Sequence, residues 1–143
     1  SDKFIAICSY FAYCFDTYGK RHGKYILLKL EYLESEQNVE RKYGTISVEH
    51  VLPQSPSKDS KWVQIFNDEE RAKFTNKLAN LVLLSHKKNS SASNLDFEEK
   101  KTKYLKGRIT DLSRSQAILT YSEWTPDILE KRQEKIIDIL SKE

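Results

Sequence analysis

The chain has 143 residues, of which 38% are hydrophobic and 31% charged, and this balance excludes a disordered polypeptide. No apolar run approaches the roughly 18 residues that span a bilayer, which argues against an integral membrane protein. The formal charge of +3 neither requires nor excludes a nucleic-acid partner, so the distribution of charge matters more than its sum.

Two amphipathic helices are predicted at the start of the chain. Apolar residues recur every three to four positions over residues 4–18, and Gly19 is expected to end this helix. Residues 25–33 form a second predicted helix with a broad apolar face. We expect the two helices to pack as a hairpin around a turn at residues 19–23.

The hydrophobic period then changes to that of a strand. Residues 45–49 alternate polar and apolar side chains, and residues 81–84 are a continuous apolar run of strand length. Between them, a short helix is predicted from Asp59, and Asn67 with Glu70 predicts a capping box that opens another helix through Lys77.

Two further helix starts follow. Asp96 with Glu99 predicts a helix that runs to about Leu105, and Thr125-Pro126-Asp127 predicts a strong helix opening: a cap, a proline at the first position and an acid near the positive end of the dipole. The predicted fold class is therefore α+β and mostly helical, with a small two-stranded antiparallel sheet in the middle.

Chemistry-bearing residues gather in that middle part: Glu49 and His50 at the end of the first strand, Asn80 at the start of the second, and Asn89 after it. Each alone has an ordinary structural interpretation. A single histidine is more often structural than catalytic, Asn80 suits a helix C-cap and Asn89 suits a turn. Their order and spacing favour a functional interpretation.

With these residues in place, three stretches resemble a known family: residues 47–54 (SVEHVLPQ), residues 78–84 (LANLVLL) and residues 88–94 (KNSSASN). They are similar to the C-terminal nuclease domain of GmrSD-type modification-dependent restriction enzymes, which are HNH (His-Me finger, ββα-metal) nucleases. The close of the chain, Trp124-Thr125-Pro126 with Arg132, resembles that family too.

The resemblance implies a domain organisation and a DNA endonuclease activity. It divides a single domain, residues 1–143, into a helical lead-in (1–44), a ββα-metal core with inserted helices (45–106) and a C-terminal helical part (107–143). The first residue is not a methionine and the chain contains none, so we expect a fragment of a longer protein.

Site roles come with the resemblance. It implies that His50 is the base that activates water, that Glu49 and Asn89 hold one divalent cation, and that Asn80 braces the loop so that the His50 ring faces the phosphate. Asn89 follows Asn80 by nine residues, as in the wider HNH pattern. A neutral imidazole, with an ordinary pKa of about 6.5, accepts a proton at cellular pH. Oxygen ligands suit Mg²⁺, with Mn²⁺ as an alternative.

This chain departs from the HNH pattern in two ways. Many such domains carry zinc-binding cysteines around the second strand, where Ser85 and Lys88 stand here, so no structural zinc is expected. The acid before the histidine is glutamate instead of the commoner aspartate, which makes its direct ligation of the cation less firmly implied.

Basic residues near the predicted site suggest a contact with DNA backbone phosphates. Residues 86–108 hold seven Lys or Arg against three acids, a local surplus of +4. A solvated helix face would have the same composition. The predicted DNA-binding residues are Lys87, Lys88, Asn94, Lys100 and Lys103; for Asn94 and Lys100, stabilising the helix is an equal alternative. His86 has no role in the family pattern, and for Arg132 both a carboxylate and a phosphate partner stay open.

The expected partners are DNA, gripped with little sequence preference, and an upstream nucleotide-hydrolysing sensor domain of the same protein. We expect a bacterial cytoplasmic location, since the two cysteines, Cys8 and Cys14, form no redox or metal motif. Two alternatives remain: a catalytically silent DNA-binding module that keeps the fold, and a protein-docking domain that uses the outer helices.

Overall fold

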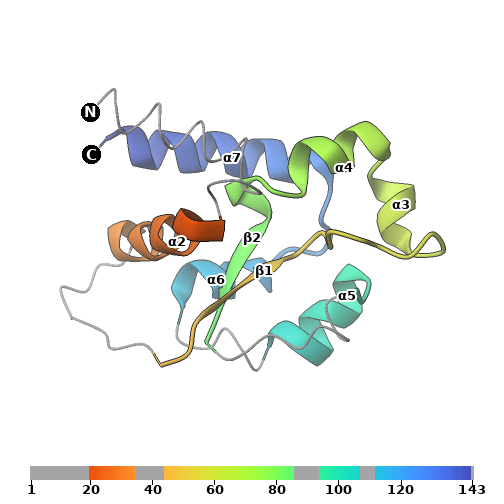
Figure 1. The fold of residues 1–143 in the computed structure, drawn as a ribbon, viewed down its shortest axis with the longest axis horizontal. Helices are drawn as coiled ribbons and strands as arrows, with labels where there is room; N and C mark the ends of the chain where they lie inside the picture. Colours follow the sequence, from red (N-terminus) through yellow and green to blue (C-terminus); the bar gives the residue numbers. More distant parts are fainter. Residues whose placement is uncertain (1–19, 35–43, 86–93, 107–111, 143) are drawn as a thin grey trace.

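The computed structural model describes residues 20–34, 44–85, 94–106 and 112–142 (Figure 1). The helix predicted over residues 4–18 lies outside these residues, as do Lys87, Lys88 and Asn89. Among the described residues, helices predominate around one two-stranded antiparallel sheet, which confirms the predicted fold class.

The sheet consists of β1 (Ser47–His50) and β2 (Leu81–Leu84). Ser47 pairs with Leu84 at one end of the ladder and His50 with Leu81 at the other. All four residues of β2 are buried, which explains why its sequence is continuously apolar and not alternating. The second strand is as predicted, and the first is displaced by one to two residues toward His50.

The first described helix, α2 (Lys20–Glu34), corrects one prediction. Residues 20–23, expected to form a turn, belong to the helix. A glycine inside a helix costs about 1 kcal/mol relative to alanine. Burying the apolar face of α2, which carries Ile26, Leu27 and Leu30, outweighs that cost.

Two short helices connect the strands: α3 (Lys61–Ile65) and α4 (Asp68–Phe74). The predicted capping box is confirmed. The Asn67 side chain accepts a hydrogen bond from the Glu70 amide at 2.8 Å, and the Glu70 carboxylate accepts one from the Asn67 amide at 2.9 Å. Helix α4 ends three residues before the predicted Lys77, and a 3₁₀ turn, η2 (Leu78–Asn80), leads into β2.

After β2 comes α5 (Phe97–Glu99), which continues as a π-helix, η3 (Lys100–Leu105). Asp96 occupies the predicted N-cap, but its side chain bonds elsewhere: its carboxylate accepts a hydrogen bond from the Lys61 amide at 3.1 Å. The helix therefore begins where predicted, while the acid ties it to α3.

The last two helices are α6 (Ser113–Ile118) and α7 (Pro126–Ser141). Helix α7 confirms the predicted opening, because the Thr125 side chain accepts from the Ile128 amide and Pro126 stands at the first position. Helix α6 had no sequence signal. Its capping group is remote: the Glu31 carboxylate of α2 accepts hydrogen bonds from the Arg114 and Ser115 amides at 3.1 and 3.2 Å.

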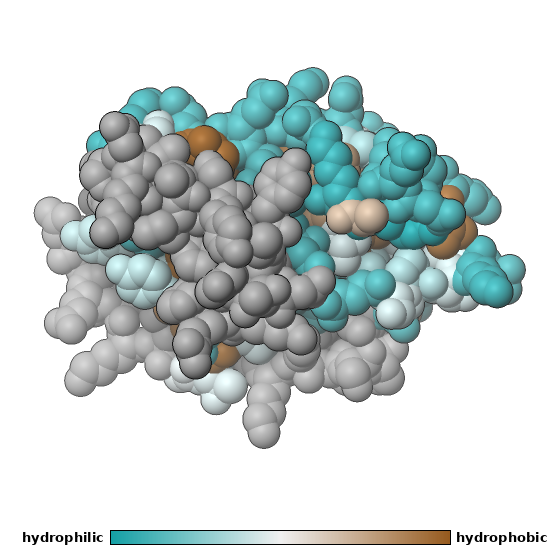
Figure 2. Space-filling view, turned by 45° about the horizontal axis from the view of Figure 1, so that its top comes forward, coloured by the Kyte–Doolittle hydropathy of each residue, from teal (hydrophilic) through white to brown (hydrophobic). Residues whose placement is uncertain are grey.

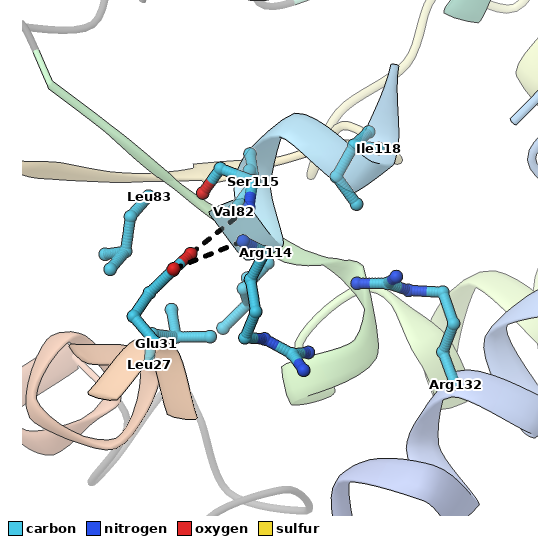
Figure 3. Close-up of a pocket in the computed structure, with 9 residues that line it drawn as sticks. Leu27, Glu31, Val82, Leu83, Arg114, Ser115, Ile118 and Arg132 are labelled. Atoms are coloured by element: carbon cyan, nitrogen blue, oxygen red, sulfur yellow. Dashed lines mark hydrogen bonds between the residues drawn. The ribbon is translucent and has the colours of Figure 1, made fainter. Parts of the chain in front are cut away.

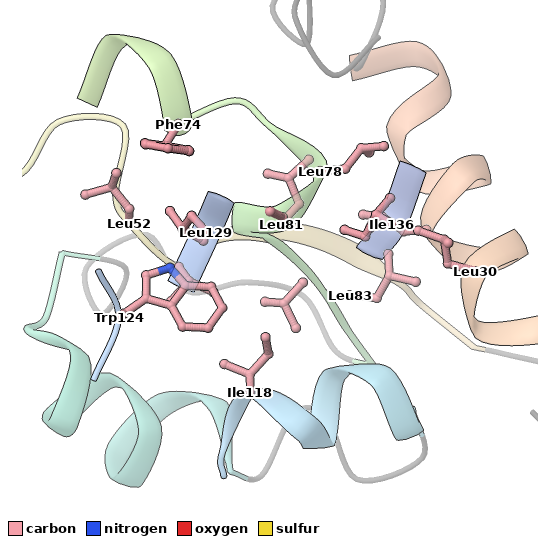
Figure 4. Close-up of a cluster of buried hydrophobic side chains, with 14 of the residues drawn as sticks. Leu30, Leu52, Phe74, Leu78, Leu81, Leu83, Ile118, Trp124, Leu129 and Ile136 are labelled. Atoms are coloured by element: carbon pink, nitrogen blue, oxygen red, sulfur yellow. The ribbon is translucent and has the colours of Figure 1, made fainter. Parts of the chain in front are cut away.

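In Figure 1 the antiparallel hairpin of strands β1 and β2 crosses the middle of the molecule, with α7 and α4 above it, α2 to the left and α5–η3 at the lower right. Helices α2, α6 and α7 each contact β2 or the turn that leads into it, and α2 also contacts α6 and α7. Their apolar side chains form one core with the strands, which includes Leu30, Leu83, Ile118, Leu129 and Ile136 (Figure 4).

The described surface on the face in Figure 2 is mainly hydrophilic, and hydrophobic colour is confined to small separate spots. Among described residues the large exposed hydrophobic side chains are Tyr25, Tyr32 and Ile65. None of the described helices combines the length and apolar character that crossing a bilayer requires.

Candidate active site

His50 ends strand β1, where its side chain is almost fully enclosed, with 6% of the residue exposed. Its ring nitrogen Nε2 lies 2.9 Å from Oδ1 of Asn76, a half-buried residue in the turn after α4. An amide oxygen only accepts hydrogen bonds, so Nε2 is the donor in this contact when it carries the ring proton. The ring thus meets a polar partner instead of the apolar interior.

Asn80 fastens the segment that follows His50. Its backbone carbonyl accepts a hydrogen bond from the Val51 amide at 2.9 Å. Its side chain bonds Leu52 at both backbone groups, with Oδ1 accepting from the amide at 2.7 Å and Nδ2 donating to the carbonyl at 3.0 Å. Nδ2 also donates to the Thr75 carbonyl at 2.8 Å, and Oδ1 accepts from the Trp124 indole at 3.0 Å. We call this set of bonds the Asn80 clamp.

The clamp is completely buried and fully used. Asn80 has no exposed surface, and its amide group forms all four contacts with groups that are themselves enclosed or partly enclosed. Removing the side chain would leave several polar groups without a partner, at about 1–3 kcal/mol for each buried group. The buried amide therefore locks the backbone on both sides of the site in one geometry.

Helix α7 holds the peptide just before Asn80. The Ala79 amide donates to Oε1 of Gln133 at 2.9 Å, and the Ala79 carbonyl accepts from Nε of Arg132 at 3.0 Å. Both side chains come from the same turn of α7, so that helix sets the path of η2. The Asn80 clamp is thereby tied to a second element of the core.

A buried ion pair lies on the other side of His50. The Lys100 ammonium, with no exposed surface, donates to the carbonyls of His50 and Val51 at 2.7 and 2.9 Å. It also lies 3.6 Å from Oε1 of Glu49, whose side chain is 4% exposed. A buried charge is tolerated only with partners, and here the ammonium has a carboxylate and two carbonyls. Lys100 therefore holds the end of β1 from within the molecule.

Comparison with known families decides which kind of domain this is. The model of the family described as GmrSD restriction endonucleases, C-terminal domain, matches residues 11–139, a span that includes every element above except the last two residues of α7. The chain belongs to this family. Searches of curated proteins and of solved structures found no match.

Membership in the GmrSD C-terminal domain family makes this the nuclease part of a restriction endonuclease, with DNA as the substrate class. The predicted strand–strand–helix order is present in the described residues, as β1, β2 and α5–η3. His50 and Asn80, 30 positions apart in the sequence, lie at the same end of the hairpin, since the partner of His50 is the residue after Asn80. Asn89, the third residue of the motif, is outside the described residues.

The predicted DNA-binding residues of this GmrSD domain differ in solvent exposure. Lys103 is exposed on η3 and pairs with Glu99 at 3.3 Å, and Asn94 is exposed before α5. Lys100 has no exposed surface and donates inward, so in this structure its ammonium does not reach a phosphate. The alternative expected for Lys100 was stabilisation of its helix, whereas its ammonium bonds the backbone at the end of β1.

Asn76 is the residue that the sequence did not single out. It lies in the turn between α4 and η2, where an asparagine has an ordinary turn interpretation. Its one distinguishing feature in the sequence is its place four residues before Asn80. That spacing does not predict which way the Asn76 side chain points, because the turn and the 3₁₀ segment do not share one helical period.

The donor set beside His50 fits a hard divalent cation in part. Glu49 supplies a carboxylate next to the histidine, and oxygen ligands are those that Mg²⁺ accepts. Lys100 shares that carboxylate at 3.6 Å, so a cation bound there would lie close to a buried ammonium. Within the described segments, no group of three or more His, Cys, Asp and Glu side chains gathers into a closed metal site.

Proposed function

We propose that this domain hydrolyses DNA phosphodiester bonds by an HNH-type mechanism in which His50 is the general base. The observation that carries the proposal is the fixed orientation of the His50 ring, with Nε2 hydrogen-bonded to Asn76 at 2.9 Å and the following backbone held by Asn80. A general base must be oriented toward its substrate as well as basic. Here Asn76, Asn80 and Lys100 hold the ring and the adjoining backbone.

The hydrogen bond to Asn76 determines which nitrogen acts. In the neutral ring the proton resides on Nε2, so the lone pair that accepts a proton from water resides on Nδ1. As Nδ1 takes that proton, positive charge develops on the ring, and the Asn76 oxygen stabilises it through the Nε2–H bond. The same bond therefore sets the tautomer and supports the charged form.

The proposed cofactor is Mg²⁺, or Mn²⁺ in its place, held by Glu49 and Asn89. When bound, such an ion neutralises charge on the scissile phosphate and on the leaving 3′ oxygen. Glu49 directly precedes the proposed base at the end of β1. The buried Lys100 ammonium, 3.6 Å from Oε1, holds that carboxylate in place.

The proposed substrate grip is electrostatic. Lys103 and Asn94 are exposed, and with Lys87 and Lys88 they would contact backbone phosphates without reading bases. In this proposal the choice of target belongs to an upstream nucleotide-hydrolysing sensor domain, and the whole protein acts in the bacterial cytoplasm against phage DNA.

The decisive experiment is plasmid nicking by His50→Ala. With supercoiled plasmid and Mg²⁺ or Mn²⁺, the wild-type protein should nick DNA and EDTA should stop it. His50→Ala should lower the rate by about 10²-fold or more while circular dichroism and DNA affinity stay unchanged. His86→Ala is the matched control, because the family pattern gives that histidine no role. Undiminished nicking by pure His50→Ala would remove His50 as the base.

A second experiment tests the orientation of the ring. Asn76→Ala should lower kcat about tenfold with little change in KM for DNA, because it removes the partner of Nε2 and leaves the DNA contacts alone. Asn76→Asp keeps an acceptor oxygen and should recover activity above that of the alanine variant. Equal losses in both variants, or a change confined to KM, would contradict a positioning role.

The silent-module alternative gives a different outcome in the same assay. A domain that shifts plasmid in a gel but shows no chelator-sensitive nicking, in either metal, would be a binding module.

A further inference from the structure

A basic hollow lies between the end of α2, α6 and α7, and His50 is not part of its lining. Its lining includes Glu34, Arg114, Tyr121, Arg132 and Lys135, and it leaves about 110 Å³ for water-sized groups. A smaller pocket beside it shares Arg114 and Arg132 (Figure 3). The two arginines therefore line both spaces.

Arg132 is anchored in this space by its inner end. Its Nε donates to the Ala79 carbonyl, and its guanidinium lies 5.0 Å from the Trp124 ring centroid and 5.6 Å from that of Tyr121. Burial lowers the pKa of Arg132, a side-chain hydrogen bond with Tyr121 opposes that shift, and the nearby charge of Arg114 adds to it. In Figure 3 the forked end of the side chain extends from α7 toward α6.

Arg114 faces the same space from α6. Its side chain is 14% exposed and pairs with Glu34 at 2.9 Å. The other nearby carboxylate, Glu31, accepts hydrogen bonds from the first amides of α6 (dashed lines in Figure 3), so it is already committed. Three cations and one carboxylate then line the hollow, which leaves a surplus of two positive charges.

We propose that this hollow is a binding site for one phosphate group. The planar fork of a guanidinium matches the oxygens of a phosphate, and two forks with an ammonium suit a doubly charged anion better than a single carboxylate. The space accommodates a tetrahedral oxyanion and not a nucleobase as well. An anion here also relieves the repulsion between two guanidinium groups that are both largely withdrawn from water.

The proposed phosphate site is connected to the proposed catalytic end through Arg132. The guanidinium that would hold the anion also holds the Ala79 carbonyl, one peptide before Asn80. Phosphate binding is thus expected to stabilise the Asn80 clamp. An effect of bound phosphate on catalysis depends on the proposed function, whereas phosphate binding itself does not.

The test measures phosphate binding by thermal shift and calorimetry, comparing sodium phosphate with sodium chloride at equal ionic strength. The wild-type protein and His50→Ala should both show phosphate-specific stabilisation, so a failure of the catalytic proposal leaves this readout intact. Lys135→Gln, an exposed change, should weaken phosphate binding about fivefold. Lys131→Gln on the same helix, exposed and not part of the lining, should have no effect. Arg114→Gln should weaken binding further.

A short duplex oligonucleotide separates the two sources of such a phosphate. If Lys135→Gln weakens oligonucleotide binding by the same factor, the site holds a backbone phosphate of DNA. If it weakens only inorganic phosphate, the ligand is a free or nucleotide phosphate. No phosphate-specific stabilisation of the wild-type protein, or equal binding by wild type and Lys135→Gln, would overturn the proposal.

Discussion

The two ends of the β1–β2 hairpin are held by different forces. At the end with His50 and Leu81, buried polar groups dominate: the Asn80 clamp on one side and the Lys100–Glu49 pair on the other. Along the rest of β2, residues such as Leu83 pack among apolar side chains of α2, α6 and α7 (Figure 4). The polar contacts at the His50 end depend on the direction of each bond, whereas the apolar packing along β2 depends on side-chain volume.

This difference has a consequence for substitution. Apolar packing is non-directional, so a side chain of similar volume replaces another at small cost. A buried hydrogen bond needs its partner at one distance and angle, and loses most of its value when either changes. The end of the sheet with His50 should therefore tolerate fewer replacements than the apolar face, although both are buried.

The largest expected effect comes from Lys100→Met, which keeps the length of the side chain and removes the charge. It removes the ammonium beside the buried Glu49 carboxylate and the donor to two backbone carbonyls, so the free energy of unfolding should fall by about 3–5 kcal/mol in urea denaturation. Adding Glu49→Gln should recover part of that loss, because the neutral amide no longer needs a cation. A loss below about 1 kcal/mol in Lys100→Met would show that the pair does not hold the strand end.

Asn80→Ala should have the next largest effect. It removes four hydrogen bonds from a site with no exposed surface, and the free energy of unfolding should fall by about 3 kcal/mol. Asn67→Ala is the matched control: this exposed N-cap should cost about 1 kcal/mol on removal. Equal losses in the two variants would mean that burial does not strengthen the clamp.

Leu83→Met tests the apolar face. The volume is conserved and no polar group loses a partner, so the free energy of unfolding should fall by less than about 1.5 kcal/mol. Nicking activity should be retained. A loss as large as that of Lys100→Met would erase the contrast between the two regions.

The smallest effect on stability is expected for Lys103→Gln. The side chain is 69% exposed, and its pair with Glu99 contributes at most about 0.5 kcal/mol. DNA binding should nevertheless respond, because each lost phosphate contact lowers the slope of log affinity against log salt by about 1. Lys131→Gln on α7 serves as the control, and an unchanged slope in Lys103→Gln would remove Lys103 from the DNA contact.

Local signals in the sequence predicted much of the fold. The capping box at Asn67 and the Thr125-Pro126 opening are short-range devices, and the structure confirms both. The apolar run of β2 was predicted at its observed bounds. The turn predicted at residues 19–23 was wrong because packing of the α2 face outweighs the local preference of Gly23.

The sequence did not predict the long-range contacts. Helix α6 takes its cap from Glu31, 83 positions before Arg114, so no local pattern marks its start. Asn76 and His50 are 26 positions apart, and Lys100 reaches the His50 carbonyl across 50. The order of the motifs predicted that His50 and Asn80 lie together. The orientation of the Asn76 side chain and the burial of Lys100 are known only from the three-dimensional structure.

Trp124 gives the molecule a built-in optical probe. The chain has two tryptophans, and a Trp62→Phe variant would leave Trp124 as the sole indole emitter. Its N–H donates to Asn80, and the cation of Arg132 lies over its ring. Fluorescence from this one residue should therefore change whenever the asparagine loosens or an anion binds to the guanidinium, so both events can be followed in real time without an added label.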